Sequence, residues 1–233
     1  MKKFAIIVAG GSGLRMGATL PKQFLLLRGQ PVLLHTLSRF MSAVPGIEII
    51  LVLPAGQKLY WEALWEKYGN HYPLTVVEGG EQRFFSVLNG LAAIDASLEE
   101  GIVGIHDGVR PLVSVETIRN AYLAAEIHGS AVPVVALNDS IRQVNQNQSQ
   151  GLDRSHYRLV QTPQCFQLKL LREAYKADFQ QHFTDDASVF EACGHQVFLT
   201  EGNPENIKIT RQSDLVIAEA LLRLEQQIQE DWN

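Results

Sequence analysis

A buried strand that runs into a glycine-rich loop constrains the fold of this 233-residue chain more than any other feature. Residues 4–8 form an unbroken apolar run rich in β-branched side chains, which is typical of a buried strand. Residues 9–17 then contain four glycines, and two cations, Arg15 and Lys22, accompany them. Glycines let the backbone turn sharply and bring its N–H groups close to a ligand. Such a loop beside two cations predicts a polyphosphate site.

Sequence features that are missing from this loop argue against two known types of phosphate-binding loop. No Gly-Lys-Ser/Thr follows the glycines, which excludes the loop of kinases and GTPases. The glycine spacing and the non-acidic end of the second predicted strand, Pro54-Ala55-Gly56, argue against a dinucleotide fingerprint. The loop, together with Pro21-Lys22-Gln23, resembles that of nucleotidyltransferases that attack an NTP at its α-phosphorus. A strand-to-helix turn without a ligand is the alternative.

Composition indicates a globular chain in a reducing compartment. Hydrophobic residues make up 46% and charged residues 19%, and the net charge of −5 argues against a nucleic-acid or polybasic membrane partner. Cys165 and Cys193 lack metal-ligand spacing and are expected to be reduced. The apolar run after Met1-Lys2-Lys3 is too short for a targeting signal, and no run approaches a membrane span. We therefore expect a cytoplasmic protein.

Apolar runs alternate with helical segments along the first half of the chain. This alternation predicts a Rossmann-like, mostly parallel sheet with helices on both faces, in a single domain over residues 1–233. Strands are expected at 4–9, 47–53, 74–77, 102–106 and 131–137, and helices at 31–42, 57–68, 82–98 and 115–128. Beyond them we expect helices at 167–176, from about Thr184 to Gly194 and at about 213–228, and a strand at 196–200.

A polar insertion at about residues 138–160 interrupts this pattern. Two short alternating runs, 141–144 and 157–160, flank a tip of Asn, Gln, Ser and Gly residues. The pattern predicts a β-hairpin arm that leaves the main sheet. Because such an arm buries little of itself alone, it is expected to dock on a second subunit, with a flexible loop as the alternative.

Polar residues follow the predicted strands, where parallel sheets bind their ligands. The candidates are the glycine loop, Gly79-Gly80 with Ser86, His106-Asp107 with Arg110, Asn138-Asp139-Ser140, and Asn206-Ile207-Lys208.

Asp107 is the strongest single candidate for chemistry. A carboxylate directly after an apolar strand is suited to Mg²⁺ or to substrate hydroxyls, whereas a helix N-cap or an ion pair with Arg110 is the alternative. His106 is expected to be structural. Taken alone, Arg83, Lys208 and Arg154 fit charges at the surface, and the turn near Gly80 fits an ordinary strand–helix connection.

With these residues assembled, the chain resembles the 2-C-methyl-D-erythritol 4-phosphate cytidylyltransferase family from end to end. The motifs are A-G-G-S-G-L-R-M-G, P-K-Q-F, E-G-G-x-x-R-x-x-S-V, H-D-G-V-R-P, D-R, Q-T-P-Q-x-F, T-D-D-A-S and N-I-K-I-T. The resemblance implies transfer of CMP from CTP to the sugar alcohol phosphate with release of pyrophosphate. It also implies a homodimer whose arms reach into each other's sites.

The resemblance also implies a role for each candidate residue. Arg15 and Lys22 would stabilise the transition state, Mg²⁺ would bridge the triphosphate near Asp107, and Lys208 and Arg154 would hold the incoming phosphate. The nucleotide would contact Ala9, Gly10, Gly11, Gly13, Gly80 and Ser86, and the acceptor Asp107, Arg110, Ser140, Arg154, Thr162, Thr184 and Lys208. Ser140 replaces a threonine common in the family, and the turn after Asp107 has Gly108-Val109 where alanines are common.

Three other functions share parts of this pattern. A ribitol 5-phosphate cytidylyltransferase would use the same loop with another acceptor. A non-catalytic nucleotide-binding module would not need the second phosphate site that Arg154 and Lys208 indicate. A dehydrogenase would be expected to have an acidic residue after the second strand, and that residue is missing here.

Overall fold

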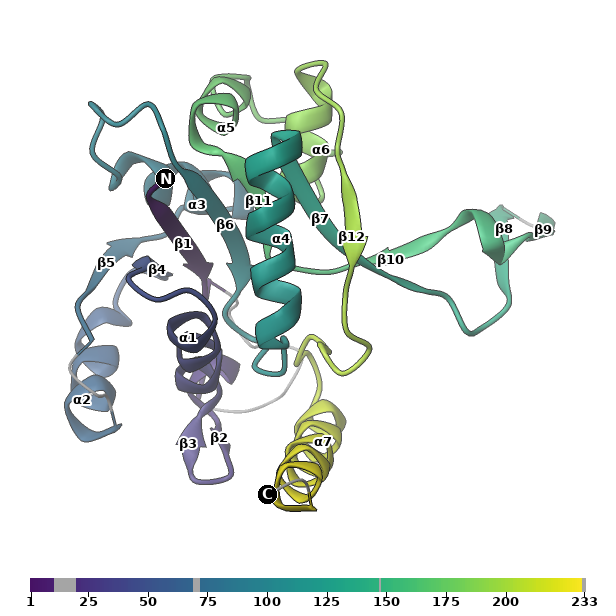
Figure 1. Cartoon of the computed structure of the whole chain (residues 1–233). Coiled ribbons are helices and arrows are strands. Elements are labelled where there is room, and N and C mark those ends of the chain that lie inside the picture. Colours follow the sequence, from purple (N-terminus) through teal and green to yellow (C-terminus); the bar gives the residue numbers. More distant parts are fainter. Residues whose placement is uncertain (11–19, 69–71, 147, 232–233) are drawn as a thin grey trace.

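The computed structural model describes residues 1–10, 20–68, 72–146 and 148–231. Its centre is an eight-stranded sheet in the order β10-β7-β11-β6-β1-β4-β5, with β12 also paired to β7 (Figure 1). The strands are β1 (Lys3–Val8), β4 (Glu48–Leu53), β5 (Leu74–Glu78), β6 (Ile102–Asp107), β7 (Ser130–Ala136), β10 (Arg158–Val160), β11 (Gln164–Gln167) and β12 (Leu199–Glu201). The neighbours β6, β1, β4 and β5 run parallel, whereas β11 is antiparallel to both β6 and β7. The predicted mostly parallel sheet is confirmed.

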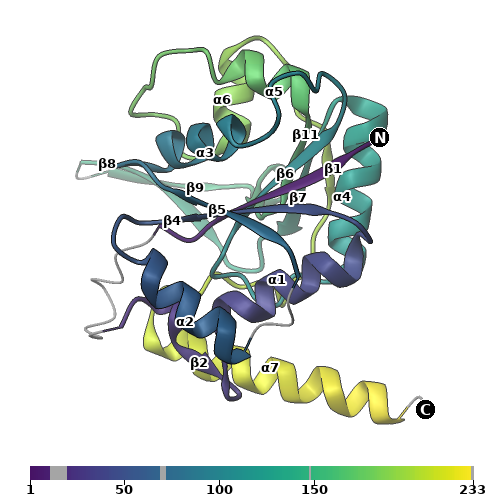
Figure 2. The same cartoon turned by 90° about the vertical axis from the view of Figure 1, so that its left-hand side faces the viewer.

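Helices cover both faces of the sheet (Figure 2). Alternate residues of β1 face opposite layers: Ala5 and Ile7 pack in one apolar cluster, and Phe4 and Ile6 in the other. This two-sided burial explains why the strand is continuously apolar in sequence. One layer contains α1 (Val32–Ala43), α2 (Lys58–Tyr68) and α4 (Val115–His128), and the other α3 (Arg83–Ala92), α5 (Leu168–Ala174) and α6 (Asp186–Ala192).

The last helix, α7 (Gln212–Asp231), packs outside these two layers. Its Ala218 and Leu222 join a third apolar cluster with Leu27 and Val32, near the short ribbon of β2 (Leu26–Leu27) and β3 (Gln30–Pro31). Among the residues that the structure describes, no helix combines the length and apolar character needed to cross a membrane.

Two element boundaries differ from the sequence prediction for identifiable reasons. Helix α3 ends at Ala92 instead of residue 98, because the Asp95 carboxylate accepts from the N–H and hydroxyl of Ser97 in a local turn. Strand β12 begins at Leu199 instead of residue 196. Two backbone groups just before this strand form hydrogen bonds with the Ser130 hydroxyl instead of with backbone groups of a neighbouring strand.

The predicted arm exists, but its strand pairing was wrong. β8 (Ile141–Asn145) pairs with β9 (Gln148–Leu152), so the hairpin closes within the polar stretch that was expected to be its tip. The run expected to pair with β8 instead forms β10, which returns to the main sheet beside β7. Ladder bonds along β8 and β9 do not need apolar side chains, and Arg142 adds bonds to Ser149. The hairpin projects away from the sheet (Figure 1).

Candidate active site

A cleft of about 240 Å³ lies at the carboxyl edge of the sheet, beyond the ends of β1, β5 and β6. It is lined by Val8, Ala9, Gly10, Lys22, Gly80, Glu81, Gln82, Arg83, Ser86, Asp107, Val109 and Lys208. Most of the nucleotide residues predicted from the sequence are therefore brought together. Gly11, Gly13 and Arg15 lie outside the described residues.

Gln23 fixes the segment that brings Lys22 to the cleft. This glutamine is fully buried, and its Nε2 donates to the carbonyl of Ala9 at 2.8 Å and to Gln57 Oε1 at 2.9 Å. The short 3₁₀ helix Lys22–Phe24 is thereby joined to the carboxyl end of β1. No role was predicted for Gln23, and the available signal in the sequence was its place between the site cation Lys22 and the aromatic Phe24.

The turn after β5 is too tight for any residue but glycine. A Cβ at Gly80 would lie 2.3 Å from the Cβ of Phe85, and one at Gly79 would lie 2.9 Å from the Ser86 hydroxyl. Ser86 Oγ accepts from the N–H of Gly80 at 3.2 Å and donates to the Gln82 carbonyl at 3.1 Å. Ser86 lines the cleft but is only 4% exposed, and its hydroxyl is already used in the bonds that shape the turn.

Three cations surround the carboxylate of Asp107. Arg83 Nη1 contacts Oδ1 at 2.7 Å, whereas Arg110 Nε and Lys208 Nζ contact Oδ2 at 3.2 and 3.1 Å. Burial alone would raise the pKa of Asp107, but Arg83, Lys208 and Arg110 outweigh it and hold this pKa well below its ordinary value. The carboxylate is therefore ionised at any physiological pH, and Lys208 is directed into the site.

Arg83 connects Asp107 to a second, fully buried carboxylate. Its Nη2 contacts Asp186 Oδ2 at 2.6 Å, while Tyr175 donates to Asp186 Oδ1 at 2.7 Å. Arg83 is therefore not the simple surface charge that its sequence position would fit when taken alone. Sequence reasoning missed this ion pair because Asp186 follows 103 positions later and looked like part of a helix start.

A hydrogen-bonded chain behind Asp107 fixes its turn. The N–H of Asp107 donates to Thr162 Oγ1 at 3.2 Å, and this hydroxyl donates to His106 Nδ1 at 2.9 Å. His106 Nε2 then donates to the Arg110 carbonyl at 3.1 Å, which assigns the proton to Nε2. Burial lowers the pKa of His106 to about 3, so the ring is neutral. Thr162 therefore lies behind Asp107 and does not line the cleft.

The segment that contains Lys208 is held beside the turn after β6. Arg110 Nη1 donates to the Asn206 carbonyl at 2.8 Å, and Asn206 Nδ2 donates to the Thr162 carbonyl at 2.9 Å. The N–H of Ile209 donates to the Val109 carbonyl at 2.9 Å. These bonds position Lys208, whose side chain is 44% exposed.

The other predicted acceptor residues do not line this cleft. Ser140 and Arg154 are exposed on the arm, where Arg154 donates to the Asn138 carbonyl. Thr184 is exposed just before α6, whose N-cap is Asp185. The described chain alone therefore brings together the nucleotide side and the Asp107 cluster, but not the arm residues.

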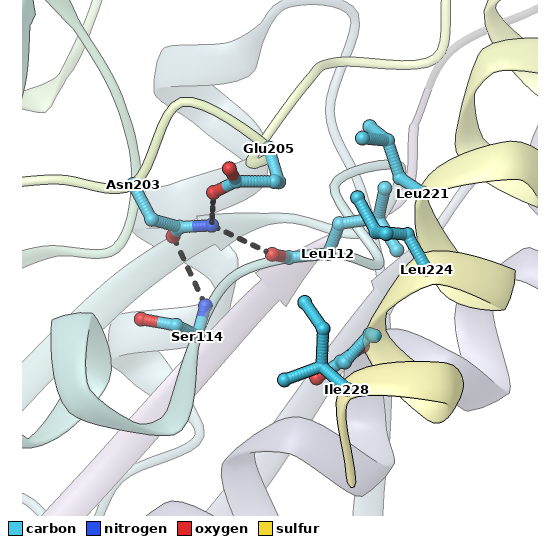
Figure 3. A pocket seen from close by; sticks show the side chains of 8 residues that line it. Leu112, Ser114, Asn203, Glu205, Leu221, Leu224 and Ile228 are labelled. Carbon is cyan, nitrogen blue, oxygen red and sulfur yellow. Dashed lines mark hydrogen bonds between the residues drawn. The ribbon is translucent and has the colours of Figure 1, made fainter. Parts of the chain in front are cut away.

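A second hollow of about 290 Å³ shares no residue with the cleft (Figure 3). Leu221, Leu224 and Ile228 of α7 form an apolar wall. Opposite them, Asn203 accepts from the Ser114 N–H at 3.0 Å and donates to the Leu112 carbonyl. Its polar side chain is thus used to join loops.

The mostly parallel sheet is covered by helices on both faces and carries glycine turns and cations at its carboxyl edge. Together these features define a class of protein. The chain is an α/β protein whose cleft is built for a phosphate-bearing ligand of the nucleotide type. The model for the family "IspD: 2-C-methyl-D-erythritol 4-phosphate cytidylyltransferase" matches residues 4–224. The chain belongs to this family.

Relatives and solved structures agree with this assignment. The 2-C-methyl-D-erythritol 4-phosphate cytidylyltransferase of Bacteroides thetaiotaomicron is 51% identical over 95% of this chain and 100% of that protein. The crystal structure of 4-diphosphocytidyl-2C-methyl-D-erythritol synthase from Anaerococcus prevotii is 32% identical, with a TM-score of 0.80 over 95% of this chain and 96% of that one. The Francisella tularensis cytidylyltransferase structure has a TM-score of 0.78 at 31% identity, over 94% of this chain and 98% of that one.

Proposed function

We propose that this chain transfers CMP from CTP to 2-C-methyl-D-erythritol 4-phosphate, giving 4-diphosphocytidyl-2-C-methyl-D-erythritol and pyrophosphate in isoprenoid precursor biosynthesis. One observation carries the proposal beyond family membership. The ionised Asp107 gathers Arg83, Arg110 and Lys208 around itself at the cleft that also contains Lys22 and the glycine turns. A site with separate cations suits two phosphate groups that must meet.

The reaction needs positioning and charge stabilisation more than covalent catalysis. A phosphate oxygen of the acceptor attacks the α-phosphorus of CTP, and the bond to the pyrophosphate oxygen breaks as the new bond forms. Two anions approach each other, so fixed cations at the transferring phosphorus lower the barrier. Lys22 lines the cleft and is assigned to the triphosphate. Arg15 is assigned the same role by the family pattern.

The acceptor is assigned to the Asp107 side of the cleft. Asp107 accepts from its hydroxyl groups, and Lys208 holds its phosphate together with Arg154. Arg110, Ser140 and Thr184 complete this side of the site by the family pattern. For Thr162 we favour an indirect contribution, because its hydroxyl is already bonded to the N–H of Asp107 and to His106.

The donor set fits a divalent cation that is shared with the nucleotide. Within the described part of the chain, no three His, Cys, Asp or Glu side chains gather as a protein-only metal site. Asp107 Oδ1 accepts a bond from Arg83 and retains a second lone pair. Mg²⁺ uses one or two carboxylates together with phosphate oxygens, so Asp107 would hold it beside the triphosphate. When bound, Mg²⁺ neutralises charge on the nucleotide.

We further propose that the protein is a cytoplasmic homodimer with exchanged arms. The arm and the strand that leads back from it expose apolar side chains, with Val144 71% and Leu159 53% exposed. A two-stranded ribbon with exposed apolar residues is marginal alone, which favours a partner surface. Arm exchange would bring Arg154 and Ser140 to the partner subunit's site.

The decisive experiment measures pyrophosphate release with CTP and Mg²⁺ and compares two acceptors at equal concentration. We expect rapid release with 2-C-methyl-D-erythritol 4-phosphate and little with ribitol 5-phosphate. Preference for ribitol 5-phosphate would overturn the acceptor and retain the nucleotide assignment. Binding of CTP without release in the presence of either acceptor would overturn the transferase proposal in favour of a binding module.

A further inference from the structure

Arg83 lies between the cleft and the protein interior. The reaction steps proposed above give it no role of its own. It is the first residue of α3 and lines the cleft, and 26% of its side chain is exposed. Its two terminal nitrogens contact two different carboxylates, Asp107 at 2.7 Å and Asp186 at 2.6 Å. A planar guanidinium held at both ends has a fixed orientation, which a lysine ammonium at the same place would not have.

Asp186 is a firm anchor for this guanidinium. Its side chain is completely buried, and Tyr175 donates to its second oxygen at 2.7 Å. The start of α6 is itself tied to β11, because Gln164 donates to Asp185 Oδ2 and accepts from the N–H of Ala187, each at 2.8 Å. The path from Asp107 through Arg83 thus ends in the rigid interior.

The two oxygens of Asp107 are used differently. Oδ2 is shared by Arg110 and Lys208, whereas Oδ1 accepts from Arg83. In the proposed reaction, Lys208 also binds the incoming phosphate, so its contact with Oδ2 weakens. The contacts from Arg83 and Arg110 then continue to define where the Asp107 carboxylate points, and the Arg83 contact at 2.7 Å is shorter than the Arg110 contact at 3.2 Å.

We propose that Arg83 is a positioning residue for cytidylyl transfer: clamped by Asp186, it fixes the Asp107 carboxylate against the acceptor. This inference rests on the proposed function for its kinetic consequence. It assigns Arg83 no contact with the reacting atoms, and it separates Arg83 from the cations that act on phosphate.

The test must separate positioning from folding. Arg83→Gln alone would leave Asp186 as an unpaired buried charge, which is strongly destabilising. The double variant R83Q/D186N removes both charges together, and its two amides are able to bond each other and Tyr175. A matched control, R39Q/E225Q, removes another two-bond ion pair, which joins α1 to α7 away from the cleft.

We expect R83Q/D186N to remain folded and to lose about tenfold or more in kcat, equivalent to about 1.4 kcal/mol of barrier. The KM for CTP should stay within about twofold, and R39Q/E225Q should keep the wild-type kcat. If Arg83 acts through Asp107, then adding R83Q/D186N to Asp107→Asn should cause no further loss. A merely structural role would not produce this non-additivity.

Three results would overturn the inference. These are an unchanged kcat in folded R83Q/D186N, a rise in the KM for CTP as large as the fall in kcat, or a further loss in the Asp107→Asn background. If the double variant does not fold, Arg83→Lys replaces it, because it keeps the charge but loses the two-ended contact, and the same outcomes apply.

A readout without turnover separates this inference from the proposed function. If the wild-type chain releases no pyrophosphate, the proposed function fails, and crystal structures of wild type and Arg83→Lys still decide the role of Arg83. A displaced or reoriented Asp107 carboxylate in Arg83→Lys supports positioning. An unmoved carboxylate overturns it.

Discussion

The buried His106 makes a quantitative prediction about acid stability. Its pKa is about 3 in the folded chain, against an ordinary value of 6.5 when unfolded. As the pH falls through 6.5, the unfolded chain takes up a proton that the folded chain refuses, so stability declines, and this loss levels off below about pH 3. Between about pH 7.5 and about pH 5.5 the imidazole should cost about 1.4 kcal/mol.

The perturbation is His106→Gln, which keeps a donor toward the Arg110 carbonyl but does not titrate. For a chain of this size, about 1.4 kcal/mol corresponds to about 3–5 °C in Tm. The Tm of wild type should therefore fall by this much more than the Tm of the variant over the same pH interval. Asp107 does not interfere, because its lowered pKa costs stability only below about pH 4.

Thermal unfolding followed by circular dichroism at several pH values is the assay. The matched control is His156→Gln on the arm, where the side chain is 79% exposed, and its curve should run parallel to that of wild type. Parallel curves for wild type and His106→Gln would refute the reasoning. They would mean that the folded chain protonates His106 as readily as the unfolded chain does.

Three further predictions concern the cleft and the arm. Lys22→Ala should lose about 10²-fold or more in kcat with pyrophosphate release as the readout, because a fixed cation at the transferring phosphate is worth about 3 kcal/mol; a near-normal rate would contradict its role. Gly80→Ala places a Cβ 2.3 Å from that of Phe85, so it should destabilise the fold by about 1–3 kcal/mol and weaken CTP binding in calorimetry, and unchanged affinity would exclude the turn from the nucleotide site. Arg154→Ala should raise the KM for the acceptor much more than that for CTP, and mixed dimers with Lys22→Ala should regain activity, whereas no regain would mean that each site is built within one chain.

The regular elements of the sheet layers could be predicted from sequence because their signals are local. Helix α4 begins after Ser114, whose hydroxyl accepts from the N–H of Thr117, and ends at Gly129 with φ of 87°. Both signals are visible in the sequence. The arm was mispaired because residues 157–160 alternate as well as any partner of β8 would. Their pairing with β7 is a long-range contact that no local pattern specifies.

The location of the site could be predicted from the sequence, but the ion pairs and hydrogen bonds within it could not. Residues at the carboxyl ends of parallel strands must meet at one edge, which is why Gly80 and Asp107 fall in one cleft, whereas Lys22 is brought there by the bond from Gln23 to Ala9. The contacts of Arg83 and Thr162 could not be predicted because their partners come from other elements of the fold. The burial of Asp186 depends on tertiary packing alone. The same is true of the hydrogen bond from the N–H of Asp107 to the Thr162 hydroxyl.

The shared counterion explains how a cleft with this many cations exists before any phosphate arrives. Arg83, Arg110 and Lys208 would repel one another if they faced the same space unpaired. Asp107 accepts from all three, and Asp186 balances the innermost one. The three cations are therefore held close together by bonds that the fold already supplies, and an incoming phosphate meets Lys208 in a place that is already fixed. The same arrangement makes the direction of Asp107 depend on Arg83, the cation that is anchored to the buried Asp186.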